Sequence, residues 1–172
     1  MVSRTVEYAL RAIVWLASQD GSPRTTRQMA HATQVPAGYL AKVMQTLVDA
    51  GLVSSQRGLG GGFVLARDPR SISVLDVVAA VEPIPRIRAC PLKLSAHQLH
   101  LCPLHRRIDD ALAMVEKAFA ESTIAELLAE GNKDAPLCPN PDAPTPRAQL
   151  TAPKRAGKPK ARRGGRPDPQ IR

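Results

Sequence analysis

The sequence predicts a mainly α-helical protein that carries one small β-hairpin. Apolar residues recur at helical spacing in several stretches of the 172-residue chain, whereas a single glycine-rich stretch, residues 57–62, separates two short β-prone runs. Aromatic residues make up only 3% of the chain against 44% hydrophobic residues, so an aliphatic core is expected. The length suggests one domain.

Three helices are expected in the N-terminal third of the chain. Ser3 is a candidate N-cap for the first helix, and the pairing of Thr25 with Gln28 is typical of a capping box at the start of the second. Pro36 is favoured in the first turn of the third helix, and Gly51 suits the position after its C-terminus. The expected ranges are residues 3–19, 25–34 and 36 to 49–51.

A β-hairpin is expected next. Residues 52–56 and 63–66 are short extended runs, and the four glycines within residues 57–62 permit positive φ angles and a tight connection. A nucleotide-binding loop is not favoured, because neither Gly-Lys-Ser/Thr nor a helix follows these glycines. Three helices and then a glycine-rich hairpin is the order of a winged helix-turn-helix.

A fourth helix, residues 74–81, is expected to begin at the N-cap Ser73. Its inward-facing residues are expected to be Leu75, Val78 and Ala79. An irregular stretch, residues 82–103, follows it. The predicted regions are a winged helix-turn-helix DNA-binding domain (1–72), a linker helix with a Cys/His loop and a dimerisation helix (73–131), and a disordered Pro-rich basic tail (132–172).

A long C-terminal helix is expected over about residues 104–120, and the capping pair Thr123 and Glu126 should start a last short helix that ends near residue 131. The apolar stripe of the long helix is narrow and consists of Ile108, Leu112, Val115 and Phe119. Such a stripe is typical of a coiled-coil seam. We therefore expect this helix to pack against a second copy of the protein; the alternative is that it packs back on the winged domain.

The charge distribution favours a polyanionic partner. The formal net charge is +9 and the pI about 10.1. Residues 133–172 account for +7 of this and hold nine of the 16 prolines, so they are predicted to be disordered, either as a solvated tail or as an electrostatic arm on DNA. Within the remainder, residues 1–70 carry eight Lys/Arg against four acids, whereas residues 71–132 carry six against eight.

Several features predict a soluble cytoplasmic protein with reduced thiols. No apolar run approaches the roughly 18 residues that a membrane span needs. The N-terminal stretch lacks the layout of a signal peptide. Three cysteines are too few for a disulfide framework.

The third helix is the expected DNA-reading helix. Its exposed positions offer polar groups at Tyr39, Lys42 and Gln45, of which Gln45 suits adenine and Lys42 suits guanine or a phosphate. For Tyr39 the alternative is packing against the second helix. Arg57 at the root of the hairpin is expected to enter a minor groove. The candidate DNA contacts are Arg24, Arg27, Gly38, Tyr39, Lys42, Gln45, Arg57 and Gly60, with Arg67 and Arg70 as further phosphate contacts.

A second group of candidate site residues lies in the irregular stretch. By spacing, Cys90, His97, Cys102 and His105 can supply four ligands, and thiolate with imidazole suits an iron–sulfur cluster or zinc. The alternative is that the cysteines are buried small hydrophobes and the histidines face solvent. A catalytic cysteine is not favoured, because no orienting third group accompanies a Cys–His pair.

Several sequence segments resemble the IscR/NsrR-type (BadM/Rrf-type) winged-helix transcriptional regulators of bacteria. The resemblance covers roughly residues 1–130. It is carried by YALR (8–11), YL (39–40), AGLVSS (50–55), RGLGGGF (57–63) and LARD (65–68), and it continues through LDVV (75–78) and AVE (80–82) into Cys90.

The resemblance implies a homodimer that crosses through its long helix and binds a palindromic operator. Many members hold an iron–sulfur cluster on a Cys-x5-Cys-x5-Cys pattern with a histidine three residues further on. Cys90, Cys102 and His105 fall on the first, third and histidine positions, whereas Ala96 occupies the middle one and His97 is adjacent. Two cysteines with two histidines would suit a 2Fe–2S centre better than a 4Fe–4S centre. In some relatives the last ligand comes from the first helix of the partner subunit, where this chain has Glu7.

The leading hypothesis is therefore a DNA-binding repressor, not an enzyme, that senses redox state, nitric oxide or iron–sulfur status through a cluster. The alternative is the same regulator with zinc, a thiol switch or no cofactor. A less favoured interpretation, based on the sparse polar groups of the reading helix, is an adaptor protein that does not bind DNA.

Overall fold

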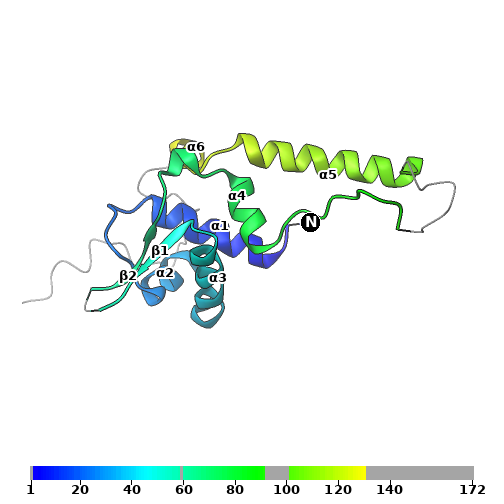
Figure 1. Cartoon of the computed structure of the whole chain (residues 1–172). Coiled ribbons are helices and arrows are strands. Elements are labelled where there is room, and N and C mark those ends of the chain that lie inside the picture. Colours follow the sequence, from blue (N-terminus) through cyan, green and yellow to red (C-terminus); the bar gives the residue numbers. More distant parts are fainter. Residues whose placement is uncertain (1, 59, 92–100, 131–172) are drawn as a thin grey trace, which may run out of the picture. The chain divides into compact units, whose positions relative to one another are not determined.

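The computed structural model describes residues 2–58, 60–91 and 101–130, all within one compact unit of the chain. The predicted fold class is confirmed, since the described part is mainly helical with one two-stranded antiparallel sheet (Figure 1). The elements are α1 (Arg4–Ala17), α2 (Thr26–Thr33), α3 (Ala37–Asp49), β1 (Val53–Gln56), β2 (Gly62–Leu65), the 3₁₀ helix η1 (Pro69–Ser71), α4 (Val74–Val81), α5 (Pro103–Glu121) and α6 (Ile124–Glu130).

The helix starts lie where the sequence signals place them. The Ser3 hydroxyl accepts a hydrogen bond from the backbone N–H of Val6, and Thr25 and Gln28 form the predicted capping box. Gly51 follows α3 with a φ of 70°, the left-handed conformation that glycine adopts without a steric penalty. Local hydrogen bonding thus fixes the starts of α1 and α2, whereas Pro36 is the N-cap of α3 and makes no side-chain hydrogen bond.

The core of the head is aliphatic, with methionine in place of aromatic residues. It lies between α1, α2 and α3 and includes side chains from β1, α4 and α6. The largest fully buried side chains are those of Ile13, Met29, Leu40, Met44, Leu47, Ile72 and Ile124. Such a core explains how a chain with 3% aromatic residues still folds.

The hairpin is attached to the helical head through the backbone of Arg24. The strands β1 and β2 pair antiparallel with Val53 opposite Leu65. Arg24 exchanges two backbone hydrogen bonds with Phe63 of β2, at 3.0 and 2.8 Å. A Cβ atom at Gly62 would lie 2.5 Å from the Arg24 carbonyl oxygen, so only glycine permits this close approach. The wing is therefore fixed to the segment that leads into α2.

The prediction of which α4 residues face the core is partly wrong. Val74, Val77 and Val78 are the buried residues, whereas Leu75 is half-buried and Ala79 is exposed. The reason is that α4 contacts α1, α3 and α5, so its buried face is set by three neighbours. After α5 the chain returns to the head, where the Ile124 N–H donates to the Ile72 carbonyl at 2.9 Å.

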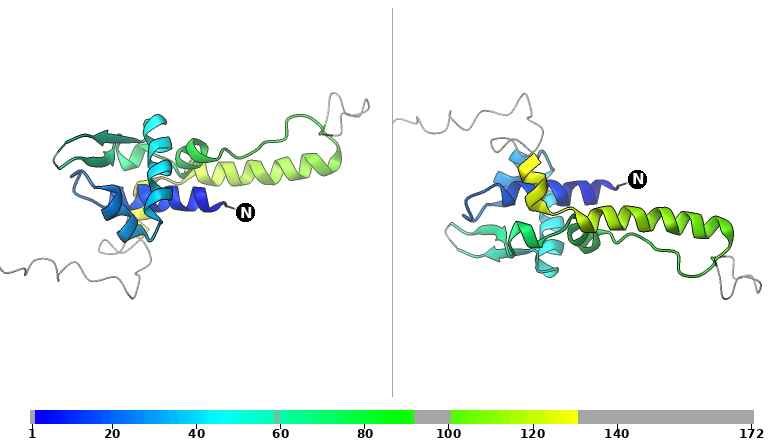
Figure 2. Two further views of the ribbon diagram at one scale, coloured as in Figure 1. Left: turned by 90° about the horizontal axis from the view of Figure 1, so that it is seen from below. Right: turned by 90° about the horizontal axis from the view of Figure 1, so that it is seen from above.

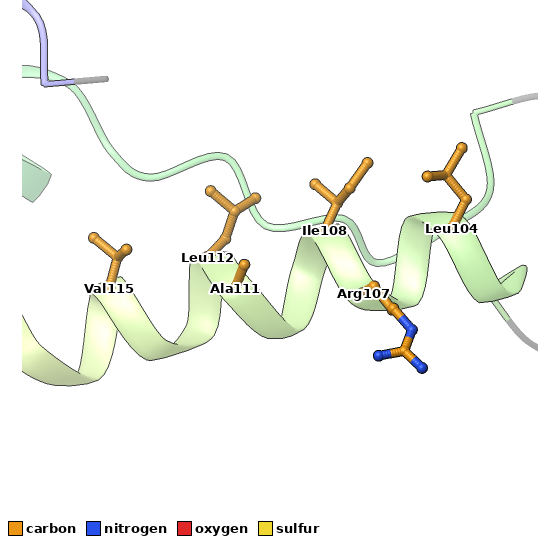
Figure 3. A pocket seen from close by; sticks show the side chains of 6 residues that line it. All are labelled: Leu104, Arg107, Ile108, Ala111, Leu112 and Val115. Atoms are coloured by element: carbon orange, nitrogen blue, oxygen red, sulfur yellow. The ribbon is translucent and has the colours of Figure 1, made fainter.

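Helix α5 extends away from the head in the views of Figures 1 and 2, and none of its residues is buried. Phe119 near its C-terminus packs against a small cluster of Val6, Val74 and Val78. Figure 3 shows the side chains of Leu104, Ile108, Leu112 and Val115 projecting from one side of α5, with Arg107 turned away from them. Together with Ala111 these residues line a shallow groove, called here the α5 groove. No helix within the described ranges is long and apolar enough to cross a membrane.

Candidate metal centre and nucleic-acid interface

Three of the predicted metal ligands lie together at the start of α5. Cys90 lies in the irregular segment after α4, Cys102 is the N-cap of α5, and His105 lies in the first turn of that helix. The Sγ atom of Cys102 lies 3.1 Å from Nδ1 of His105, and the Sγ atom of Cys90 lies 3.9 Å from the same nitrogen. One ligand atom from each of the three residues lies within 4.8 Å of the others, and Cys90 is buried.

The chemistry of this donor set fits a metal or an iron–sulfur cluster. Two thiols and one imidazole are ligands that zinc and iron–sulfur centres both accept. A spacing of three residues places Cys102 and His105 on one side of the first turn of α5. His97, the predicted fourth ligand, lies outside the described residues. Glu7, the alternative ligand for a partner subunit, forms an ion pair with Arg11 on its own helix.

An ion-pair cluster that the sequence analysis missed lies beside these ligands. Arg86 donates from Nε and Nη2 to both carboxylate oxygens of Asp109 (2.8 and 2.7 Å), and from Nη1 to Glu116 (2.7 Å). The backbone N–H of Ile87 donates to Asp109 Oδ1 at 2.8 Å. The partners lie 22 to 30 residues apart, so no local sequence pattern announces them. We refer to Arg86, Ile87, Asp109 and Glu116 as the Arg86 clamp.

The clamp holds Asp109 in its charged form. The Arg86 side chain is the main cause, and the Ile87 N–H the next, of a pKa of the Asp109 carboxyl that is lowered from 3.8 to about 2. Reciprocally, Asp109 and then Glu116 raise the pKa of the Arg86 guanidinium. The side chains of Arg86 and Asp109 are 28% and 15% exposed, so water competes little for these hydrogen bonds.

The lowered pKa predicts an acid-dependent loss of stability. A carboxyl whose folded pKa lies below its unfolded value stabilises the fold above the unfolded value and loses this contribution as the pH falls through the folded one. The difference in unfolding free energy between wild type and Asp109→Asn should therefore be constant above about pH 5 and shrink between about pH 4 and pH 2. Urea unfolding at a series of pH values measures it.

The Lys117–Glu121 pair on the same helix supplies the control for this titration. It is exposed, and its closest N–O distance is 3.7 Å. The substitution Glu121→Gln should change stability little at any pH, because exposed pairs contribute little. An Asp109→Asn variant as stable as wild type at pH 7, or equally destabilised at pH 7 and pH 2, would contradict the assignment.

The structure places most of the predicted DNA contacts on exposed positions of α2, α3 and the hairpin. Gly60 has a φ of 81° and Arg57 lies directly after β1. Gln45 donates from its side-chain amide to Asp49 at 2.8 Å, one turn further along α3. The exposed members of the predicted set are Arg27, Gly38, Tyr39, Lys42, Gln45, Arg57 and Gly60, together with Arg67 and Arg70.

Besides Gln45, four predicted DNA contacts have structural partners within the chain: Arg67 donates to the Ser71 carbonyl, Arg70 forms an ion pair with Asp68 at 2.7 Å, and Tyr39 and Arg24 have the partners that follow. The hydroxyl groups of Tyr39 and Thr5 are hydrogen-bonded at 2.5 Å, and the rings of Tyr39 and Tyr8 meet edge to face with centroids 5.5 Å apart. Tyr39 thus packs on α1, whereas the alternative considered from the sequence was α2. The half-buried Arg24 side chain forms an ion pair with Asp20 at 3.1 Å.

Comparison with known proteins connects this geometry to one group of regulators. Residues 2–130 match the Rrf2 family, described as an iron-dependent transcriptional regulator. A helix-turn-helix-type transcriptional regulator of Aquifex aeolicus is 30% identical over 129 residues, which cover 73% of this chain and 90% of that protein. An Rrf2-like regulator of Rhodobacter capsulatus is 31% identical over 156 residues, which cover 80% of this chain and 98% of that protein.

Solved structures share the fold. The structure titled IscR from T. potens superposes with a TM-score of 0.63 at 25% identity and covers 81% of this chain and 93% of that chain. CymR of B. subtilis, titled the global cysteine regulator, superposes with a TM-score of 0.64 at 23% identity and covers 77% of this chain and 98% of that chain. The identity to CymR supports a likeness of fold alone.

Proposed function

The chain belongs to the Rrf2 family of helix-turn-helix transcriptional regulators, and from this membership we propose that it is a homodimeric repressor of transcription. The repressor binds a palindromic operator, and it senses redox state, nitric oxide or iron–sulfur status. The observation that carries the sensing part is the convergence of Cys90, Cys102 and His105 within 4.8 Å. The description of the family as iron-dependent supports iron over zinc.

Three ligands are assigned to the cofactor from the described residues. Cys90, Cys102 and His105 would hold an iron–sulfur cluster, of the 2Fe–2S type if His97 completes the set. Glu7 of the partner subunit is the alternative fourth ligand. Such a cluster supplies iron and sulfide that react with nitric oxide and oxidants. None of the proposed DNA contacts is among these ligands, so in this proposal different residues bind the cofactor and the DNA.

Ligation would add a further connection between two parts of the fold that the Arg86 clamp already joins. Cys90 lies in the irregular segment after α4, whereas Cys102 and His105 lie at the start of α5, the proposed dimer helix. Binding all three to one centre would strengthen the attachment of that segment to α5. Its release would then change how the two DNA-binding heads are held. Because operator half-sites lie about one helical turn apart, a small rotation of the heads changes affinity strongly.

The DNA contacts are assigned from the exposed residues of the winged head. In this proposal α3 enters the major groove with Gly38, Tyr39, Lys42 and Gln45 near the bases, and Arg57 and Gly60 of the wing approach a minor groove. The phosphate contacts are Arg24, Arg27, Arg67 and Arg70. The ion pair of Arg24 with Asp20 would have to open for such a contact.

The proposal is tested by anaerobic purification followed by footprinting. We expect a coloured protein with iron and inorganic sulfide, and a footprint on a palindrome selected from random duplexes. The footprint should persist near physiological salt after deletion of residues 132–172. A colourless, iron-free protein that binds its operator would refute the cluster, and zinc in its place would favour the second candidate, a zinc-containing regulator. Operator recognition would be refuted if DNA binding were non-specific, were lost on deletion of residues 132–172, and weakened steeply as the salt concentration rose. That outcome would favour an adaptor protein.

A further inference from the structure

The Arg86 clamp joins the two segments that carry the candidate ligands. Arg86 lies four residues before Cys90, and Asp109 lies four residues after His105. Two parallel hydrogen bonds of 2.8 and 2.7 Å connect Arg86 to Asp109, which makes the pair a bidentate one. The clamp therefore connects the irregular segment to α5 at positions four residues away from a candidate ligand in each segment.

We propose that Arg86 and Asp109 are positioning residues that hold Cys90 within reach of Cys102 and His105. The inference rests on the proposed metal centre and adds to it two residues that are not themselves ligands. Neither belongs to the group of donor atoms that lie within 4.8 Å of one another. Their part is to fix the backbone that presents Cys90.

The backbone contact is what limits the position of Cys90. Asp109 Oδ1 accepts from the N–H of Ile87, three residues before Cys90. Three residues of extended chain span at most about 10 Å, so fixing Ile87 on α5 confines Cys90 to the neighbourhood of His105. Residues 82–91 form no helix or strand that would do this instead.

The third partner orients the guanidinium. Glu116 lies two turns beyond Asp109 on α5 and accepts from Arg86 Nη1 at 2.7 Å. The planar guanidinium is held in one orientation because Asp109 and Glu116 bind it on two different edges. A lysine ammonium cannot form both the two parallel hydrogen bonds to Asp109 and the third to Glu116. Arg86→Lys should therefore retain only part of the effect.

The test uses the full-length chain with Cys138→Ser in every variant, so that Cys90 and Cys102 are the remaining thiols. Arg86→Met and Asp109→Asn are compared with Glu121→Gln, which removes an ion pair on α5 outside the clamp. Co²⁺ titration reports affinity and, through the thiolate charge-transfer band, the number of bound thiolates. Dibromobimane, which fluoresces strongly when it bridges two nearby thiols, reports on Cys90 and Cys102 in metal-free protein.

Loss of the clamp should weaken Co²⁺ binding roughly ten- to a hundredfold, the range typical of residues that support metal ligands, with a weaker charge-transfer band. Bimane bridging should fall in parallel. Arg86→Lys should lie between Arg86→Met and wild type, and the double variant should be no worse than the worse single one, because both remove the same contact. Glu121→Gln should match wild type in both assays.

Two outcomes separate the clamp from the centre that it serves. Clamp variants that unfold at lower temperature but keep wild-type Co²⁺ affinity and bimane bridging would show a merely structural role and overturn the inference. A wild type that binds neither Co²⁺ nor iron would refute the proposed centre, and the bimane comparison would still decide whether the clamp holds the two thiols together.

Discussion

The Cys102→Ser variant is expected to purify without iron or sulfide and yet to remain folded. A serine hydroxyl is a poor ligand at neutral pH because it keeps its proton, whereas a thiolate binds iron strongly. Cys102 is the N-cap of α5 and makes no capping hydrogen bond with its side chain. Serine is among the best N-cap residues, so the metal-free variant should be as stable as the metal-free wild type or more stable by up to about 1 kcal/mol.

The measurement combines iron and sulfide analysis with thermal unfolding of wild type and variant, each with and without cofactor. Operator affinity should no longer differ between protein prepared anaerobically and protein exposed to nitric oxide. Cys138→Ser is the matched control, because this cysteine lies in the predicted tail and should not change iron content. Stoichiometric iron and sulfide in Cys102→Ser would show that Cys102 is not a ligand.

The zinc alternative predicts a different pattern for the same variant. A structural zinc site contributes directly to folding free energy, so its loss lowers the unfolding temperature of the protein as purified. Colourless wild type with one zinc per chain, and a variant that unfolds well below it, would therefore support zinc. The two accounts differ in spectrum as well as in stability, which makes this variant informative for either.

Sequence signals were sufficient where the decisive interactions are local. The starts of α1, α2 and α6 follow from hydrogen bonds between residues three apart, such as Thr25 with Gln28 and Thr123 with Glu126. Cys102 and His105 are likewise close along the chain, and one helical turn brings them together. The winged-helix order and the closeness of Cys102 to His105 were therefore predictable.

Sequence signals were insufficient where a residue's role depends on a distant partner. Seven of the eight residues of α4 are apolar, so its periodicity carries no contrast that could identify the buried face. Tyr39 contacts Thr5 and Tyr8 because of the way α1 and α3 pack, which no local pattern specifies. The pairing of Arg86 with Asp109 likewise spans 23 residues.

The substitution Val115→Glu is expected to convert the proposed dimer into a monomer and to lower operator affinity by about 10²- to 10⁴-fold. Val115 lies at one end of the apolar side chains that line the α5 groove, and it is 44% exposed (Figure 3). Burying this face against a second copy removes apolar area from water, whereas a glutamate there would bury an unpaired charge in each subunit. Loss of the second DNA-binding head then removes the multivalent gain in affinity.

Met114→Glu provides the matched control for this prediction. It introduces the same charge at the neighbouring position, where the side chain is 67% exposed and outside the residues that line the α5 groove. Sedimentation equilibrium should show a dimer for Met114→Glu and a monomer for Val115→Glu. Unfolding of the winged head should be alike in both, because neither residue belongs to its core. A Val115→Glu variant that remains a dimer with wild-type operator affinity would exclude the α5 groove as the dimer interface. The proposed effect of the cluster on the spacing of the two DNA-binding heads could then not act through this face of α5.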